Sequence, residues 1–157
     1  MTAFIQPAAV RRSVTVRVSR ERAFSVFTEG FDRWWPRSHT ISDSPLKKAV
    51  IEPRVGGRWF GLSEDGRESE WGDVLVFEPP ARLVLAWRIG GQWTYDPNLL
   101  TEVEVTFTDL GQGQTRVDLE HRGLERLGAA GEAARVAIAG PEGWGGLLEA
   151  FRAAAEG

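Results

Sequence analysis

The 157-residue sequence predicts an α+β fold in which a C-terminal helix covers one face of an antiparallel β-sheet. Two patterns support this prediction. Residues 46–122 read as strand after strand with turn residues at regular intervals, and residues 141–157 carry apolar side chains at helical spacing. An antiparallel sheet with one solvated face must cover its other face, and the final helix supplies that cover.

A strand and a short helix open the predicted fold. Val14, Val16 and Val18 alternate with polar residues, which is the period-2 pattern of a half-buried strand. Ser19 has the residue type of a helix N-cap, and an apolar stripe follows it toward Gly30. We therefore expect the helix to begin directly after the strand.

A second short helix follows at FDRWW, residues 31–35. It must end there because Pro36 disfavours helical geometry at the residue before it. Residues 36–45, PRSHTISDSP, then form a polar loop. The chain thus places two short helices between the first strand and the rest of the sheet.

Six further strands are expected, at LKKAVIEP, GRWFGLS, SEWGDVLVFE, RLVLAWRI, TEVEVTFTD and QTRVDLEHR. The last two flank a hairpin loop at residues 111–113 and each has one apolar and one charged face. The apolar face carries Val103, Val105, Phe107, Val117, Leu119 and His121. The opposite face, which we expect to be solvated, carries Glu102, Glu104, Arg116, Asp118 and Glu120.

The C-terminal segment follows residues 124–140, which predict a short helix or ordered loop. Pro141 and Glu142 suit the first turn of a helix. Its apolar stripe at i, i+3, i+4 and i+7 consists of Trp144, Leu147, Leu148 and Phe151.

Two glycines interrupt this helix pattern. Gly145 and Gly146 each cost about 1 kcal/mol relative to alanine inside a helix. Either a close approach to the sheet or to a ligand favours a bare backbone there, or residues 143–146 are a frayed start and the regular helix begins later.

Composition excludes several classes of function. The net charge of −3 and scattered basic residues argue against nucleic-acid binding. No apolar run is long enough to span a membrane, so we expect a cytoplasmic protein, read as a single domain over residues 1–157. The absence of cysteine excludes disulfides, thiolate catalysis and zinc sites built on sulfur.

Four motifs resemble one protein family: VSRERAF, VGGRW, WGDVLVFEPPARLVLAW and GWGGLLEAF. They are similar to the START-like superfamily (SRPBCC, birch-pollen-allergen-like), and more closely to its branch of activator of heat shock protein 90 ATPase homologues. The resemblance covers roughly residues 10–155. None of these motifs is a catalytic signature.

The resemblance implies a helix-grip fold. In that fold a curved antiparallel sheet, here of about six or seven strands, wraps a long C-terminal helix and leaves a cavity for an apolar ligand between them. Relatives in the superfamily bind lipids, sterols, polyketides or hormones, and a few are cyclases or dehydratases. The implied function is binding of an apolar or aromatic small molecule, lipid-like or metabolite-like, with no cofactor.

Aromatic residues from different strands and from the final helix are the candidate walls of this cavity, because ligand pockets are mostly apolar with few polar groups. The expected ligand-binding residues are Trp34, Trp59, Trp71, Trp87, Trp93, Tyr95, His121, Trp144 and Leu148.

The tryptophan pair at the second short helix needs a separate prediction. Adjacent residues on a helical turn diverge by about 100°, so Trp34 and Trp35 cannot face the same way. In the helix-grip family this segment borders the cavity entrance. We expect Trp35 to anchor the helix to the core and Trp34 to lie at the entrance.

The two histidines are the candidates for chemistry. His121 falls on the apolar face at a strand end, where an imidazole at the cavity mouth could bind a carboxylate or act as general base; the alternative is a structural histidine bonded to backbone. His39 lies near Ser38, Ser42 and Asp43, but no nucleophile elbow supports a catalytic triad. With only two histidines, 82 positions apart, no metal site is expected.

Two other functions remain open. One is an enzyme of the cyclase, dehydratase or hydrolase type, with His121 or an inward carboxylate as acid or base. The other is a protein-interaction module, including a chaperone partner, ranked lower because the additional domain of the eukaryotic activators is not in this sequence; a homodimer is compatible with all three. The ionisable residues whose strand face stays undecided are Glu52, Arg58, Glu70 and Asp73.

Overall fold

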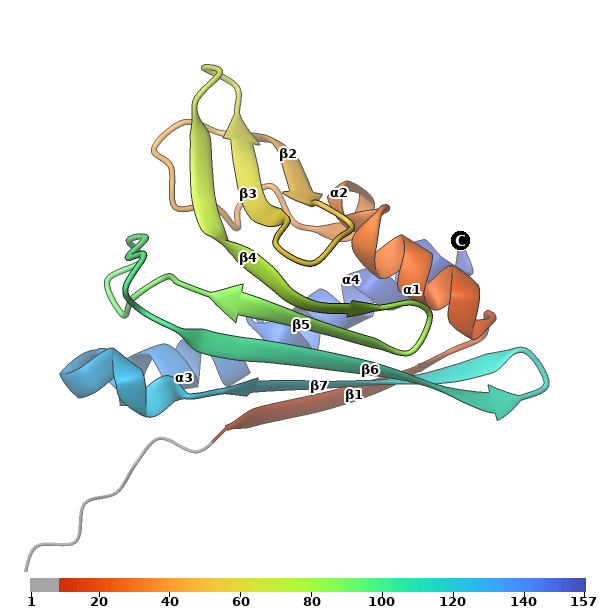
Figure 1. Cartoon of the computed structure of the whole chain (residues 1–157). Helices are drawn as coiled ribbons and strands as arrows, with labels where there is room; N and C mark the ends of the chain where they lie inside the picture. Colours follow the sequence, from red (N-terminus) through yellow and green to blue (C-terminus); the bar gives the residue numbers. More distant parts are fainter. Residues whose placement is uncertain (1–8) are drawn as a thin grey trace, which may run out of the picture.

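The computed structural model describes residues 9–157, which form a curved seven-stranded sheet with helices on its concave side (Figure 1). All neighbouring strands are antiparallel, in the order β1-β7-β6-β5-β4-β3-β2. The strands are β1 Val10–Val16, β2 Leu46–Ile51, β3 Arg58–Ser63, β4 Glu68–Glu78, β5 Arg82–Trp87, β6 Thr101–Gly111 and β7 Gln114–Arg122. The predicted α+β class and the strand series are confirmed.

Two short helices connect β1 to β2, as predicted, and three helical segments end the chain. The helices are α1 Arg20–Thr28, α2 Phe31–Trp34, the 3-10 helix η1 Leu124–Ala130, α3 Gly131–Ala139 and α4 Trp144–Glu156. Ser19 caps α1, since its Oγ accepts the backbone N–H of Arg22 at 3.2 Å. Within residues 9–157, no helix has the length and apolar character needed to cross a membrane.

The first strand lies further toward the N-terminus than the valine alternation predicted. β1 begins at Val10, which is opposite His121 of β7, and ends at Val16, so Val18 lies outside it. The hydroxyl of Thr115 donates to the Val18 carbonyl at 2.9 Å. This bond holds the chain where it leaves the sheet for the Ser19 cap.

The predicted faces of the β6–β7 hairpin are confirmed. The six residues expected on the apolar face are each at most 2% exposed. The other face carries ion pairs, in which Arg122 reaches Glu102, Glu104 and Glu120 at 3.2, 2.7 and 3.4 Å. One side of the sheet is therefore a core surface and the other faces water.

The C-terminal helix packs its predicted stripe into the core, because Trp144, Leu147, Leu148 and Phe151 are all buried. Pro141 and Glu142 do not belong to its first turn, as had been expected, but to a turn that precedes α4. This sharp turn separates α3 from α4.

Glycine is required at two positions, Gly143 at the end of that turn and Gly146 in the first turn of α4. A Cβ on Gly146 would lie 2.1 Å from the Pro141 carbonyl oxygen, and one on Gly143 would lie 1.9 Å from the Ile138 carbonyl oxygen. Gly145 has no such close neighbour, the nearest being the Arg12 Nε at 3.9 Å. Gly143 and Gly146 therefore allow the close approach of the two helices at this reversal, and the regular helix begins at Trp144 without a frayed start.

Candidate functional site

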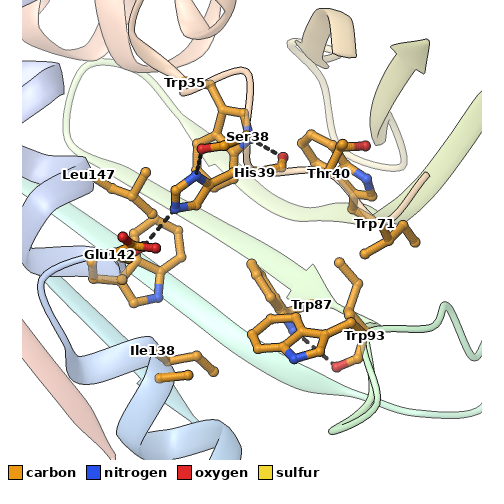
Figure 2. A pocket seen from close by; sticks show the side chains of 15 residues that line it. Trp35, Ser38, His39, Thr40, Trp71, Trp87, Trp93, Ile138, Glu142 and Leu147 are labelled. Atoms are coloured by element: carbon orange, nitrogen blue, oxygen red, sulfur yellow. Dashed lines mark hydrogen bonds between the residues drawn. The ribbon is translucent and has the colours of Figure 1, made fainter. Parts of the chain in front are cut away.

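A pocket of about 310 Å³ opens between the sheet, the loop after α2 and the α3–α4 turn. Such a volume is at the lower end of the range for small-molecule sites. Figure 2 shows side chains from all three parts of the fold around one hollow. Its main walls are five tryptophans: Trp35, Trp71, Trp87, Trp93 and Trp144.

These five residues, here called the pocket tryptophans, come from separate elements. Trp71 and Trp87 lie on β4 and β5, Trp144 is the first residue of α4, Trp35 follows α2, and Trp93 lies in the β5–β6 loop. Four of them are buried, and only Trp93 is largely exposed, at 45%. The sheet, the β5–β6 loop, the segment after α2 and the start of α4 therefore all contribute to one aromatic site.

Hydrogen bonds hold three of the indoles in place. The Nε1–H groups of Trp35 and Trp87 donate to the carbonyls of His39 and Ile89, at 2.9 and 3.0 Å. Trp144 donates to His121 Nδ1 at 3.1 Å. A buried indole that is fixed by its N–H keeps its ring plane defined, so these walls are rigid.

Trp71 is the exception among the buried pocket tryptophans. Its Nε1 has no hydrogen-bond partner among the described residues, although the ring is only 2% exposed. The ring of Trp35 packs against it at 5.7 Å between centroids. No hydrogen bond to a described residue fixes this ring, so its position depends on packing, including close packing against Gly61 of β3.

Trp34 and Trp35 are both buried in the core, so the expected anchoring role of Trp35 is confirmed and the expected entrance position of Trp34 is wrong. Trp34 lies in the core, where its Nε1–H donates to the Val26 carbonyl at 3.1 Å and its ring lies 5.6 Å from that of Phe151. Trp35 lines the pocket. The cause is the backbone: Trp35 is already extended, at φ −72° and ψ 123°, because Pro36 follows it, so its side chain leaves the helical direction.

His121 is on the apolar face as predicted, but it does not lie at a cavity mouth. It is fully buried, and that burial lowers its pKa from 6.5 to about 3. Because the Trp144 indole donates to Nδ1, the proton is on Nε2, which donates to Thr101 Oγ1 at 2.9 Å. The Thr101 hydroxyl in turn donates to the Trp87 carbonyl at 3.0 Å.

This chain of bonds makes His121 a neutral support for two pocket walls. It connects the Trp144 indole on α4 to the backbone of Trp87 on β5. A general base that works near neutral pH needs a pKa close to that pH. His121 does not meet that condition, and it does not line the pocket.

His39, in contrast, lies at the polar edge of the pocket (Figure 2). Its Nε2 donates to the backbone carbonyl of Glu142 at 2.6 Å, and its Nδ1 accepts from the Ser38 hydroxyl at 3.1 Å. Asp43 is not part of this arrangement, because it pairs with Arg67. A backbone carbonyl, and no carboxylate, therefore orients the imidazole.

The predicted ligand-binding residues divide into two groups. Those that line the pocket are Trp71, Trp87, Trp93 and Trp144. Those that do not are Trp34, Trp59, Tyr95, His121 and Leu148. Trp59 and Leu148 are buried in the core, and Tyr95 is exposed two residues beyond Trp93.

Other lining residues had not been predicted. They are Trp35, Ser38, His39, Thr40, Ile41, Ile89, Ala137, Ile138, Glu142, Gly143 and Leu147. Most of them lie in the loop after α2 and in the α3–α4 turn, which have no periodic pattern. Leu147 was on the predicted helix stripe, and that was the one available signal for its burial.

The undecided charged residues do not line the pocket. Arg58 is within 3.5 Å of carboxylate oxygens of Glu52, Glu68 and Glu70, and Asp73 pairs with Arg88 at 2.7 Å. The Arg58 side chain is 42% exposed, so this is a solvent-facing ladder. Within residues 9–157 no three metal-ligating side chains come together.

Comparison with solved structures gives two relatives at 38% identity. One is the anthrahydroquino-gamma-pyrone synthase Txn09 complexed with SUM, where 95% of this chain and 97% of that chain are covered with a TM-score of 0.67. The other is the self-sacrificing resistance protein CalC from Micromonospora echinospora, with coverage of 95% and 94% and a TM-score of 0.70.

A more distant match shows the fold alone. The Aha1 dimer from Colwellia psychrerythraea is 15% identical over 95% of this chain and 96% of that chain, with a TM-score of 0.59. The comparison with curated proteins gives no match. The family model for Activator of Hsp90 ATPase homolog 1-like protein matches residues 17–156, and the chain belongs to this family.

Proposed function

We propose that this protein binds a flat aromatic small molecule in the pocket between the sheet and its C-terminal helices. The observation that carries the proposal is the wall of five tryptophans around a hollow of about 310 Å³. Indoles offer large flat faces for stacking, and a pocket of this size admits a molecule of a few fused rings. The 38% identity to a synthase of an anthrahydroquino-gamma-pyrone adds support, since that name describes a fused-ring aromatic compound.

The polar edge of the pocket supplies orientation. Ser38, His39 and Thr40 line this edge, and Glu142 of the α3–α4 turn lies next to His39, whose Nε2 donates to its carbonyl. Hydroxyl groups pair with the oxygens of phenols and related compounds, and the His39 imidazole, whose two nitrogens already bond to Ser38 and Glu142, holds the Ser38 hydroxyl in place. The ligand class that fits best is therefore a fused-ring aromatic with oxygen substituents along one edge.

The test uses anthraquinone-2-sulfonate as probe and the quenching of tryptophan fluorescence as readout. The blocking variant is Ala137→Trp, because Ala137 is exposed and lines the pocket from α3. The matched control is Val136→Trp on the same helix, since Val136 is 60% exposed and does not line the pocket. We expect saturable quenching in the wild-type protein and in the control, and at least tenfold weaker binding in Ala137→Trp.

Equal affinity in both variants would show that the probe binds elsewhere and would refute the proposal.

An alternative function is an enzyme that uses the same pocket, and chromatography of the recovered probe distinguishes it from binding alone. The observation that favours this alternative is the oriented Ser38–His39 pair at the pocket edge, which could move a proton to or from a bound ring oxygen. Unchanged probe supports binding alone, and a new product supports catalysis.

A further inference from the structure

Trp93 differs from the other pocket tryptophans because its side chain has neither a hydrogen bond nor an aromatic contact with the described residues. Its side chain makes no ring contact with a described aromatic residue, and its Nε1 makes no hydrogen bond to a described residue. It is 45% exposed, whereas the other four are at most 9% exposed. Much of the Trp93 indole is thus exposed, and Figure 2 shows this side chain among those that line the pocket.

The backbone of Trp93 has a conformation that bulky residues rarely adopt. Its φ is +60°, in the left-handed region, which glycine occupies without steric cost. The Trp93 N–H donates to the Gly90 carbonyl, and the Gly90 N–H donates to the Thr94 carbonyl, both at 2.9 Å. This is a three-residue hairpin loop, and its left-handed position ordinarily favours glycine.

Contacts on both sides brace this loop. A Cβ on Gly91 would lie 2.3 Å from the Ala130 Cβ, so the loop packs directly against η1. On the other side, Arg88 Nη1 donates to the carbonyls of Pro97 and Leu99 at 3.2 and 3.1 Å. The backbone that carries the uncovered indole is therefore fixed before any ligand binds, which reduces the entropy cost of binding.

We propose that the Trp93 indole stacks on the outward face of a planar aromatic ligand and closes the pocket mouth. This inference rests on the proposed function and assigns the selectivity for flat molecules to one residue. The four buried tryptophans form the inner walls of the pocket whether or not a ligand is bound. A tryptophan at this position costs backbone strain, and stacking supplies the ring contact that the folded protein lacks.

The experiment compares Trp93→Ala and Trp93→Gly with two control variants, Gln112→Ala and Gln112→Gly. Gln112 is the other described non-glycine residue with positive φ, at +57°, and it lies in the β6–β7 hairpin outside the pocket. Calorimetry measures binding of planar anthraquinone-2-sulfonate and of non-planar adamantane-1-carboxylate. Thermal unfolding measures stability without ligand.

We expect both Trp93 variants to bind anthraquinone-2-sulfonate about tenfold more weakly than wild type, with little change for adamantane-1-carboxylate. Both Gln112 variants should keep wild-type affinity. At each position the glycine variant should unfold about 3 °C above the alanine variant, because glycine relieves the left-handed backbone.

Wild-type affinity of Trp93→Ala for the planar probe would overturn this inference and leave the proposed function intact. An equal loss for the planar and the non-planar probe would also overturn it, since Trp93 would then only shape the pocket. If the wild-type protein binds neither probe, the proposed function fails and this inference fails with it.

Discussion

Both ends of the space between the sheet and α4 are aromatic, but phenylalanine fills one end and tryptophan lines the other. At the first end, the rings of Phe24, Phe27, Phe107 and Phe151 meet at centroid distances of 5.1 to 5.8 Å. At the second end, the pocket tryptophans surround about 310 Å³ of open space. We call these the phenylalanine end and the tryptophan end.

Hydrogen bonding explains the difference. A phenyl ring has no polar atom, so it can pack against others from all sides without a penalty. The indoles of Trp35, Trp87 and Trp144 are each tied to a carbonyl or an imidazole, which fixes them at the wall. The pocket therefore lies where three tryptophans are anchored individually at its wall, whereas the phenylalanine end is closed by rings that pack on one another, together with the ring of Trp34, 5.6 Å from that of Phe151.

Phe151→Ala tests the closed state of the phenylalanine end and should have the largest effect. The side chain is fully buried and packs on the ring of Phe27 at 5.2 Å. We expect the free energy of unfolding to fall by about 3–5 kcal/mol, measured by urea denaturation.

The control for that change is Tyr95→Ala, which truncates an aromatic residue that is 39% exposed and should alter stability little. A loss below about 1 kcal/mol in Phe151→Ala would mean that the surrounding rings collapse into the space, contrary to a rigidly packed end.

A pH titration distinguishes the two ends by their chemistry, because only the tryptophan end is supported by a buried histidine. The pKa of His121 is about 3 in the folded protein and 6.5 as the ordinary value. Below pH 6.5 the unfolded chain binds a proton that the folded chain does not, so stability falls as pH falls, by up to about 1.4 kcal/mol per pH unit.

Between pH 7.5 and 5, where most carboxylates remain ionised, we expect the free energy of unfolding to fall by about 2 kcal/mol in total. Urea denaturation at each pH measures this change. In His121→Gln the amide can replace the Nε2–H donor to Thr101 but cannot gain a proton, so this part of the pH dependence should vanish. An unchanged slope in the variant would assign the effect to other groups.

Comparing two tryptophans within the tryptophan end should give the smallest effect. Trp144→Phe removes the donor to His121 Nδ1 and leaves a buried acceptor without its partner. Trp71→Phe removes an N–H that has no partner among the described residues. We expect Trp144→Phe to be less stable than Trp71→Phe by about 1–2 kcal/mol, measured by chemical denaturation. Equal losses would show that ring size, and not hydrogen bonding, holds these walls.

Much of the fold could be predicted from local patterns. The alternation in TEVEVTFTD correctly assigns the inner face of β6, because strand side chains alternate between faces. Spacing likewise identifies the buried stripe of α4 from Trp144 to Phe151. Ser19 caps α1 as expected because the N-cap bond is local to the chain.

The candidate site was less predictable, because many of its lining residues come from the loop after α2 and the α3–α4 turn, which have no periodic pattern. Trp35 lines the pocket because Pro36 keeps the Trp35 backbone extended. Trp34 lies in the core, where it donates to the Val26 carbonyl and packs against the ring of Phe151. The strand pattern places His121 on the apolar face, but it does not show that Trp144 covers it from α4.

The sequence by itself determined the α+β class, the order of the elements, the polar and apolar faces of the hairpin and the family resemblance. These properties depend on residue types at short spacing, which act before the chain is folded. Only the tertiary structure decided which tryptophans surround the pocket, that His121 is neutral and buried, and that His39 lies at the pocket edge beside Glu142. The last two of these properties depend on contacts between residues that lie 23 and 103 positions apart, and packing of the sheet against its helices sets them.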